Sequence, residues 1–220
     1  MMATEIVEKL LVWTPFLAGG FVWNVVISLV AMAIGTLLGS VLARLRLSER
    51  KPLVHASLAL TELARNIPTF VFLFYLAFLI PVEFDVSGRL YSFPAWLKAS
   101  LALSVAVVGF VSDNLSVAWR YWRNNNHAAA LLFIPSWTMY LVIIVMASST
   151  ASVIGVGEIV SRCNTIIAAE EGRAELMLWI YLYATFYFLF FCFPLYLAMD
   201  HMKKRMQARI SIAFLQRREL

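Results

Sequence analysis

The sequence predicts an all-α membrane protein with five transmembrane helices, its N-terminus outside the cytoplasm and its C-terminus inside. Of its 220 residues, 62% are hydrophobic and 14% are charged, whereas soluble domains carry about 25% charged residues. Five apolar stretches are long enough to cross about 30 Å of hydrocarbon. Basic residues gather between alternate stretches, as the positive-inside rule requires of membrane proteins.

A short amphipathic piece precedes the first span. Residues 5–17 place large apolar side chains on one helical face, and Gly19-Gly20 is expected to end this piece. Residues 21–43 then form the first span. Small residues recur at every fourth position of this span, at Ala31, Gly35, Gly39 and Ala43. Such a stripe predicts close packing against another helix.

The second apolar region, residues 53–80, is divided by Pro68. Glu62 and Arg65 stand three residues apart before that proline, so they can neutralise each other on one helix face. This pair is either an ion pair at the membrane–water boundary or part of a functional site.

An exposed loop and a third span follow. The loop covers residues 81–95 and the span covers residues 96–118, with Asp113 near its far end. An acid at that depth is costly unless it faces the bundle interior or a cavity, so we expect Asp113 to do so.

The fourth span begins near residues 128–132, is interrupted at Pro135 and runs to about residue 152. Hydroxyls close it, at Ser148, Ser149, Thr150 and Ser152. They can bond back to carbonyls, bond across to a neighbouring helix, or face a wet cavity. Because successive helical residues point about 100° apart, the four cannot all face one neighbour, and some are expected to face a pathway.

The remaining segments are two connections, the fifth span and a basic tail. Residues 119–127 are expected to form a polar and aromatic turn, and residues 155–175 an acidic loop on the opposite side. Residues 176–199 form the fifth span. Residues 200–220 form a basic tail, expected to be an amphipathic helix lying on a membrane face.

The distribution of basic residues sets the predicted topology. Twelve Lys and Arg lie in residues 44–51, residues 119–127 and the tail, against five on the other side. The side with twelve is therefore expected to face the cytoplasm.

Three segments carry a family pattern in the family's order: the first span running into residues 42–48, residues 61–68 with the aromatic-rich run to Pro81, and residues 148–160. Together they resemble the membrane permease subunit of an ABC importer for polar amino acids, a type I importer of the binding-protein-dependent permease family. The resemblance implies three parts: an N-terminal amphipathic segment (1–20), an ABC transmembrane type-1 permease domain (21–199) and a basic cytoplasmic tail (200–220).

The resemblance also implies partners and a location. A second permease subunit (a heterodimer is favoured), two cytoplasmic ATPase subunits and a periplasmic solute-binding protein would complete the importer in the lipid of a bacterial inner membrane. ATP and Mg²⁺ would be held by the ATPase subunits, so this chain is expected to bind no cofactor or metal, to be no enzyme and to bind no nucleic acid. Its sequence contains no Gly-x-x-x-x-Gly-Lys-Ser/Thr phosphate loop.

Candidate site residues follow from the motifs and from polar groups at depth. The predicted substrate pathway comprises Asn66, Thr69, Ser148, Ser149 and Thr150. The predicted structural or gating residues are Glu62, Arg65, Pro68, Asp113, Gly155 and Gly157.

The chain departs from the family between its third and fourth spans. The family carries a Glu-Ala-Ala-x-x-x-Gly coupling motif there, whereas this connection is short and holds Trp119, Arg120, Trp122 and Arg123. These four are either an ATPase contact or an ordinary interfacial turn. Two functions therefore remain: a transporting permease, or a non-transporting scaffold or regulatory membrane subunit with a degenerate coupling loop.

Overall fold

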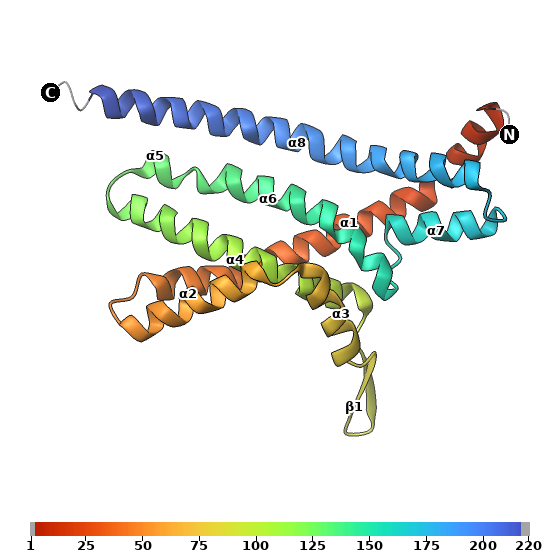
Figure 1. Cartoon of the computed structure of the whole chain (residues 1–220), viewed down its shortest axis with the longest axis horizontal. Coiled ribbons are helices and arrows are strands. Elements are labelled where there is room, and N and C mark those ends of the chain that lie inside the picture. The colour runs from red at the N-terminus through yellow and green to blue at the C-terminus, as the bar shows by residue number, and fades with distance from the viewer. Residues whose placement is uncertain (1–2, 217–220) are drawn as a thin grey trace.

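The structure, a computed structural model, describes residues 3–216, and nearly all of them are helical (Figure 1). In chain order the elements are α1 (Ala3–Arg46), α2 (Lys51–Asn66), α3 (Thr69–Leu79), β1 (Glu83–Val86), β2 (Arg89–Ser92), α4 (Ala95–Arg123), α5 (His127–Ala130), α6 (Phe133–Ala147), the 3₁₀ helix η1 (Ser148–Ile154), α7 (Ile159–Ala169) and α8 (Ala174–Gln216). The long helices run along one axis, while α3 leaves the bundle sideways and leads into the β1–β2 hairpin.

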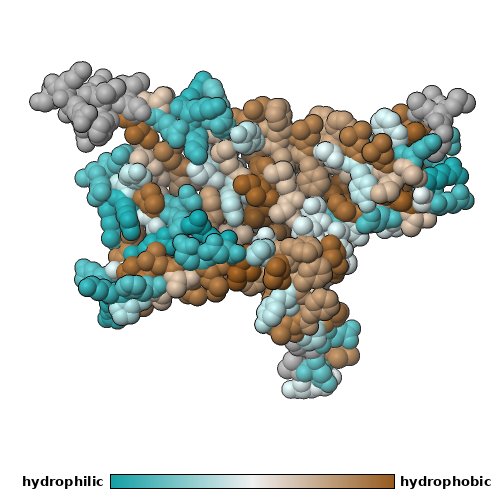
Figure 2. Space-filling model, in the orientation of Figure 1, coloured by the Kyte–Doolittle hydropathy of each residue, from teal (hydrophilic) through white to brown (hydrophobic). Residues whose placement is uncertain are grey.

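Within residues 3–216, four helical segments are long and apolar enough to cross a membrane, and α2 with α3 makes a fifth if the bent pair is one span. Figure 2 shows apolar side chains across the middle of the bundle and hydrophilic ones at its two ends. The left end in this view holds the α1–α2 and α4–α5 connections. The predicted multi-pass all-α architecture is therefore confirmed, while the count of five spans and the orientation stay predictions.

Helix α1 is continuous from Ala3 to Arg46, so the predicted break at Gly19-Gly20 is wrong. The two glycines allow α7 to approach α1 closely. A Cβ on Gly20 would lie 2.9 Å from the backbone of Ile159, and one on Gly19 would lie 2.6 Å from Arg162. Helix α7 therefore packs directly on this part of α1. This tertiary contact stabilises α1 as a helix even though two glycines lie within it.

The predicted small-residue stripe packs against α4. A Cβ on Gly35 would lie 2.8 Å from the Ser104 carbonyl oxygen, and one on Gly39 would lie 2.9 Å from that of Val108. Ala31 and Ala43, at the ends of the stripe, are fully buried. The prediction of close helix packing is confirmed, since only small side chains let the two backbones approach this far.

Helices α2 and α3 meet at 93°, so Pro68 divides the second apolar region as predicted. Pro68 disfavours helical backbone at the preceding residue, and Ile67 is accordingly extended. The buried Lys98 ammonium donates to the Ile80 carbonyl at 2.5 Å and to that of Ala77 at 3.4 Å. These bonds satisfy carbonyls at the C-terminal end of α3 and fix it against α4.

The predicted loop at residues 81–95 contains the β1–β2 hairpin. Glu83 pairs with Ser92 and Val86 with Arg89, leaving a two-residue turn in which Ser87 and Gly88 both have positive φ. Such backbone matches the twist of a tight hairpin. The exposure predicted for this segment is confirmed along β2.

The α4–α5 connection is shorter than predicted. Residues 119–123 continue α4, and only residues 124–126 lie between the two helices, so the predicted turn at 119–127 is wrong for its first half. The fourth span is interrupted between α5 and α6, as predicted, but Pro135 lies inside the first turn of α6. A proline is tolerated in that turn because its missing N–H needs no partner there.

Two further predictions are corrected in the C-terminal third. The segment predicted as a loop at 155–175 contains α7, whose first turn is capped by Glu158. Helix α8 is continuous into the tail, so the tail is helical but is no separate helix turned along a membrane face (Figure 1). At residues 155–175 and in the tail, tertiary packing and helix propagation outweigh the local sequence preferences on which the predictions were based. Arg217 and Arg218 of the predicted tail lie outside the described residues.

Candidate functional site: a polar pocket at the α2–α3 elbow

An open pocket of about 490 Å³ lies at the elbow between α2 and α3, against α4 and α6. It lies where the chain bends by 93° at Pro68, which lines it. Its lining residues are Ala64, Arg65, Ile67, Pro68, Thr69, Ala106, Phe110, Asp113, Asn114 and Tyr140. We call it the elbow pocket.

Charged side chains border the elbow pocket on one side. Asp113 accepts hydrogen bonds from Arg46 at 2.5 Å and from Arg65 at 2.8 Å. Arg46 is nine-tenths buried, whereas Arg65 is about half exposed, with 53% of its side-chain surface accessible. These three residues, the elbow cluster, carry one net positive charge. They tie the end of α1 to α2 and α4.

A chain of hydroxyls extends the elbow cluster into the bundle. Arg46 donates to Ser112 at 3.2 Å, and the Ser112 and Thr61 hydroxyls lie 2.7 Å apart. The Arg46 Nε is buried and has no hydrogen-bond partner among the residues that the structure describes. Asp113 thus contacts the buried Arg46 on one side and lines the pocket on the other, as predicted for an acid within a span.

Two polar groups in the elbow pocket are free. The Thr69 hydroxyl makes no hydrogen bond within residues 3–216, and the same holds for Asn114 Oδ1, although Asn114 Nδ2 donates to the Phe110 carbonyl at 2.8 Å. Phe110 and Tyr140 also line the pocket, with their rings stacked 4.0 Å apart. An apolar wall with a few convergent polar groups is typical of a small-molecule site.

The four hydroxyls of η1 are arranged differently. Each donates to the carbonyl three residues earlier, at 2.7 Å for Ser148, 2.9 Å for Ser149, 2.8 Å for Thr150 and 2.9 Å for Ser152. This is one of the two structural uses that such hydroxyls can have. The pathway role of Ser148, Ser149 and Thr150 stays a prediction.

Ser148 belongs to a buried polar network that the sequence patterns did not predict. Asn24 Nδ2 donates to Ser148 Oγ and to Glu158 Oε2, both at 2.9 Å, and Asn24 Oδ1 accepts from the Ile159 N–H at 3.1 Å. Glu158 also accepts from the backbone of Val160 and Ser161. Asn24, Ser148 and Glu158 are fully buried, and we call them the outer cluster. The signal in the sequence was an amide inside an apolar span.

The predicted site residues therefore divide by location. Arg65, Pro68, Thr69 and Asp113 meet in the elbow pocket. Glu62 and Asn66 are exposed on α2; Asn66 donates to Glu62 at 3.2 Å, and Glu62 lies 3.8 Å from Arg65, the predicted pair. Gly155 and Gly157 line a different pocket, described below.

The predicted ATPase-contact residues lie in the last turns of α4. Trp119 and Trp122 line an apolar groove of about 340 Å³ against α5 and α6, and the Trp122 ring meets the His127 ring edge-on at 4.4 Å. Arg120 and Arg123 are exposed. Their contact with an ATPase stays a prediction.

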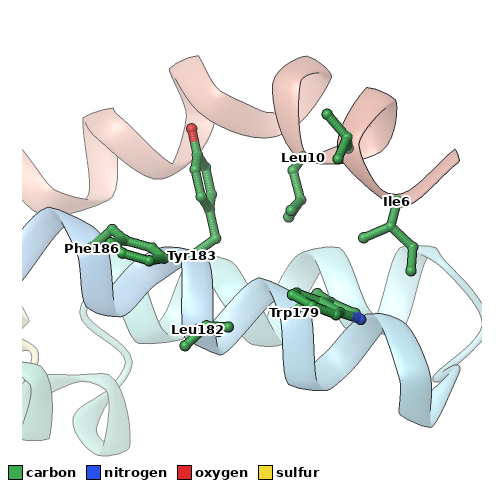
Figure 3. Close-up of a pocket in the computed structure, with 7 residues that line it drawn as sticks. Ile6, Leu10, Trp179, Leu182, Tyr183 and Phe186 are labelled. Carbon is green, nitrogen blue, oxygen red and sulfur yellow. The ribbon is translucent and has the colours of Figure 1, made fainter. Parts of the chain in front are cut away.

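A further groove, of about 240 Å³, lies between the start of α1 and α8 and has an entirely apolar surface (Figure 3). Ile6 and Leu10 face Trp179 and Phe186 across it. The Tyr183 hydroxyl is hydrogen-bonded to Thr14 at 2.9 Å. Because the surface of this groove is entirely apolar, it suits hydrocarbon and not a polar solute.

Two solved structures share the fold. A crystal structure of an amino acid ABC transporter with histidines matches with a TM-score of 0.71 and 16% identity, covering 90% of this chain and 97% of that chain. The MetNI methionine ABC transporter, in inward-facing conformations, matches with a TM-score of 0.59 and 15% identity, covering 88% and 97%. No protein-family model and no curated protein sequence matches. The chain therefore shares the fold of these ABC transporter structures, as its motifs predicted.

Proposed function

We propose that this chain is the membrane permease subunit of an ABC importer and forms half of a translocation pathway for a polar amino acid or related small solute. The elbow pocket is the observation that carries the proposal, because it gathers a hydroxyl, an amide and a charged pair inside an apolar bundle. Polar groups at such depth are costly, and in membrane proteins they mark solute pathways. The permease-like fold supports the same assignment.

The charges of the elbow cluster fit a zwitterionic solute. A solute carboxylate can bind the half-exposed Arg65 guanidinium and displace it from Asp113, while the buried Arg46 keeps Asp113 paired. The released Asp113 oxygen can then accept from the solute ammonium. Thr69 and Asn114 supply neutral hydrogen bonds beside it. The broken span places carbonyls of the last turn of α2 at the same point, as at discontinuous transporter helices.

The other parts of the importer would come from partner chains. Two cytoplasmic ATPase subunits would hold ATP and Mg²⁺ and drive alternating access, a second permease subunit would complete the pathway, and a periplasmic binding protein would deliver the solute. Trp119, Arg120, Trp122 and Arg123 would meet an ATPase subunit at the cytoplasmic end. The setting is a bacterial inner membrane.

The test is ATP-driven uptake of polar amino acids by the purified complex in proteoliposomes. Thr69→Val keeps the side-chain shape and removes the free hydroxyl, and Asn114→Leu removes the free amide oxygen. We expect each to lower kcat/KM about tenfold, the loss of one or two hydrogen bonds of about 1 kcal/mol each. Ser40→Ala is the matched control, since that hydroxyl only bonds back to the Thr36 carbonyl at 2.6 Å. Normal uptake by both elbow variants would contradict the proposal.

A second candidate function, a non-transporting scaffold or regulatory subunit, is favoured by the α4–α5 connection. Only residues 124–126 separate α4 from α5, and α5 has four residues, which leaves little structure to enter an ATPase groove. This candidate predicts that both elbow variants transport normally while removal of the chain disassembles the complex. The uptake assay therefore separates the two functions.

A further inference from the structure

A second polar pocket, of about 450 Å³, lies near the junction of α1 with α7, on the predicted outer side, and shares no residue with the elbow pocket. Helices α1 and α7, the start of α4 and the turn after η1 enclose it. Its lining residues are Phe16, Trp23, Ala95, Trp96, Gly155, Val156, Gly157, Ser161, Arg162 and Thr165. We call it the outer pocket.

Arg162 is a fixed cation in the outer pocket. Its Nε donates to the Gly157 carbonyl at 3.0 Å, its Nη1 donates to the Phe16 carbonyl at 2.6 Å, and its guanidinium lies 4.7 Å from the centre of the Phe16 ring. Within residues 3–216, its Nη2 has no hydrogen-bond partner and Arg162 makes no ion pair. The guanidinium is thus held in place by neutral groups while its charge is unmatched.

Further donors accompany this cation. The Gly157 N–H and the Ser161 hydroxyl make no hydrogen bond within the described part of the chain, and both residues line the pocket. The lining includes no acid. The neighbouring Glu158 is fully buried, and its carboxylate is held in the outer cluster by Asn24 and by backbone N–H groups. An unmatched guanidinium with a free N–H and a free hydroxyl favours an anion.

The walls of the outer pocket suit the part of such a ligand that lies beyond its anionic group. The Trp23 and Trp96 rings lie 5.9 Å apart and tilted by 40°. Indole faces attract ammonium and quaternary ammonium groups and also contact apolar stems. A volume of about 450 Å³ suits a molecule of amino-acid or headgroup size.

We propose that the outer pocket binds the oxyanion of a small ligand, either the carboxylate of an amino acid or the phosphate of a lipid headgroup. Arg162 Nη2, the Gly157 N–H and the Ser161 hydroxyl receive the oxyanion, and the Trp23 and Trp96 faces receive the remainder. This site goes beyond the proposed function, because it is separate from the elbow pocket and does not depend on transport.

The test uses the full-length protein, with the partners that copurify, in a maltoside detergent that contains no phosphate. Tryptophan fluorescence is titrated with glutamine, with glutaminamide, which lacks the carboxylate, and with dioctanoyl phosphatidylglycerol. We expect a saturable change with glutamine or with the phosphatidylglycerol but not with glutaminamide. Saturation by glutamine identifies the solute as the source of the oxyanion, and saturation by the lipid alone identifies a headgroup. The signal should fall when Trp23 and Trp96 are changed together to Phe.

Arg162→Gln should weaken the apparent affinity at least tenfold, and Arg173→Gln is its matched control, because Arg173 is exposed and pairs with Glu171 at 3.2 Å. Because Arg162 also holds α7 against α1, a second variant is needed. A Cβ on Gly157 would meet no atom within 4 Å, so this position has room for a side chain, and Gly157→Val should fill the pocket and also abolish binding. Thr69→Val should leave this binding unchanged. Absence of saturable binding, or equal affinity in Gly157→Val, would overturn the proposal.

Discussion

The outer cluster and the elbow cluster differ in whether their polar groups can still bind another molecule. The outer cluster of Asn24, Ser148 and Glu158 is fully buried, and hydrogen bonds within the chain occupy its amide and carboxylate groups. The elbow cluster lies beside a pocket, its Arg65 is half exposed, and the neighbouring Thr69 hydroxyl is free. Buried, satisfied polar groups hold helices together, whereas polar groups with spare hydrogen-bonding capacity beside a cavity can recognise a solute.

The largest expected effect concerns which side of the membrane each cluster faces. Ser92, in the exposed hairpin, and Asn124, in the α4–α5 turn, are exposed positions for single cysteines. A membrane-impermeant thiol reagent added outside intact cells should label Ser92→Cys and leave Asn124→Cys unlabelled, because the basic connections are expected in the cytoplasm. The reverse labelling pattern would mean that the topology is inverted and that each cluster faces the other side of the membrane.

Breaking the clusters should affect stability unequally. Asn24→Ala leaves the buried Glu158 and Ser148 without their amide partner, so we expect a loss of about 3 kcal/mol in free energy of unfolding. Arg65→Ala removes a half-exposed guanidinium and leaves the Asp113 pair with Arg46 in place, so we expect a loss of at most about 1 kcal/mol. Denaturant titration in detergent measures both, with Ser40→Ala as the control within about 0.5 kcal/mol. Equal losses would remove the distinction between the clusters.

The predicted cytoplasmic end, beyond the elbow cluster, should make only a small contact with an ATPase. Trp122 and Arg123 lie at the end of α4, with the Trp122 side chain packed against His127. Changing both to Ala should weaken copurification of the ATPase by about two- to threefold, because a few exposed side chains contribute little beside the partner permease's own contact. Complete release of the ATPase would make this short connection a true coupling element.

The smallest effect is expected beyond the outer cluster, where Lys9 forms an ion pair with Glu170 between α1 and α7. The hydrogen bond from Lys9 lowers the pKa of Glu170. A lowered carboxyl pKa contributes stability above the unfolded pKa of about 4.3 and loses it as pH falls through the folded value. Glu170→Gln should therefore cost less than about 1 kcal/mol at pH 7, with the difference from wild type shrinking below about pH 4. A constant difference across that range would exclude the ion pair as its cause.

Sequence reasoning predicted features that depend on local or periodic patterns. The Gly35–Gly39 stripe, the division at Pro68 and the interior acid Asp113 follow from helical spacing, proline geometry and the cost of buried charge. It missed the partnership of Asn24 with Glu158, because the two residues are 134 positions apart and meet only through tertiary packing. The break predicted at Gly19-Gly20 was wrong for the same reason. Glycine permits both a helix end and close approach of another helix, and only the tertiary packing decides between the two.

The most direct test of the elbow pocket as a pathway is the accessibility of Thr69→Cys in the assembled complex, with Cys163 and Cys192 replaced by Ala. Alternating access requires this position to react with a cytoplasmic thiol reagent without nucleotide and with an external one when ATP is trapped in the partner ATPase. A polar amino acid should slow both reactions. Ser40→Cys is the control and should show no dependence on nucleotide or solute, since Ser40 bonds within its own helix and does not line the elbow pocket. If the labelling rate of the Thr69→Cys thiol depends on neither nucleotide nor solute, the elbow pocket is not part of a pathway.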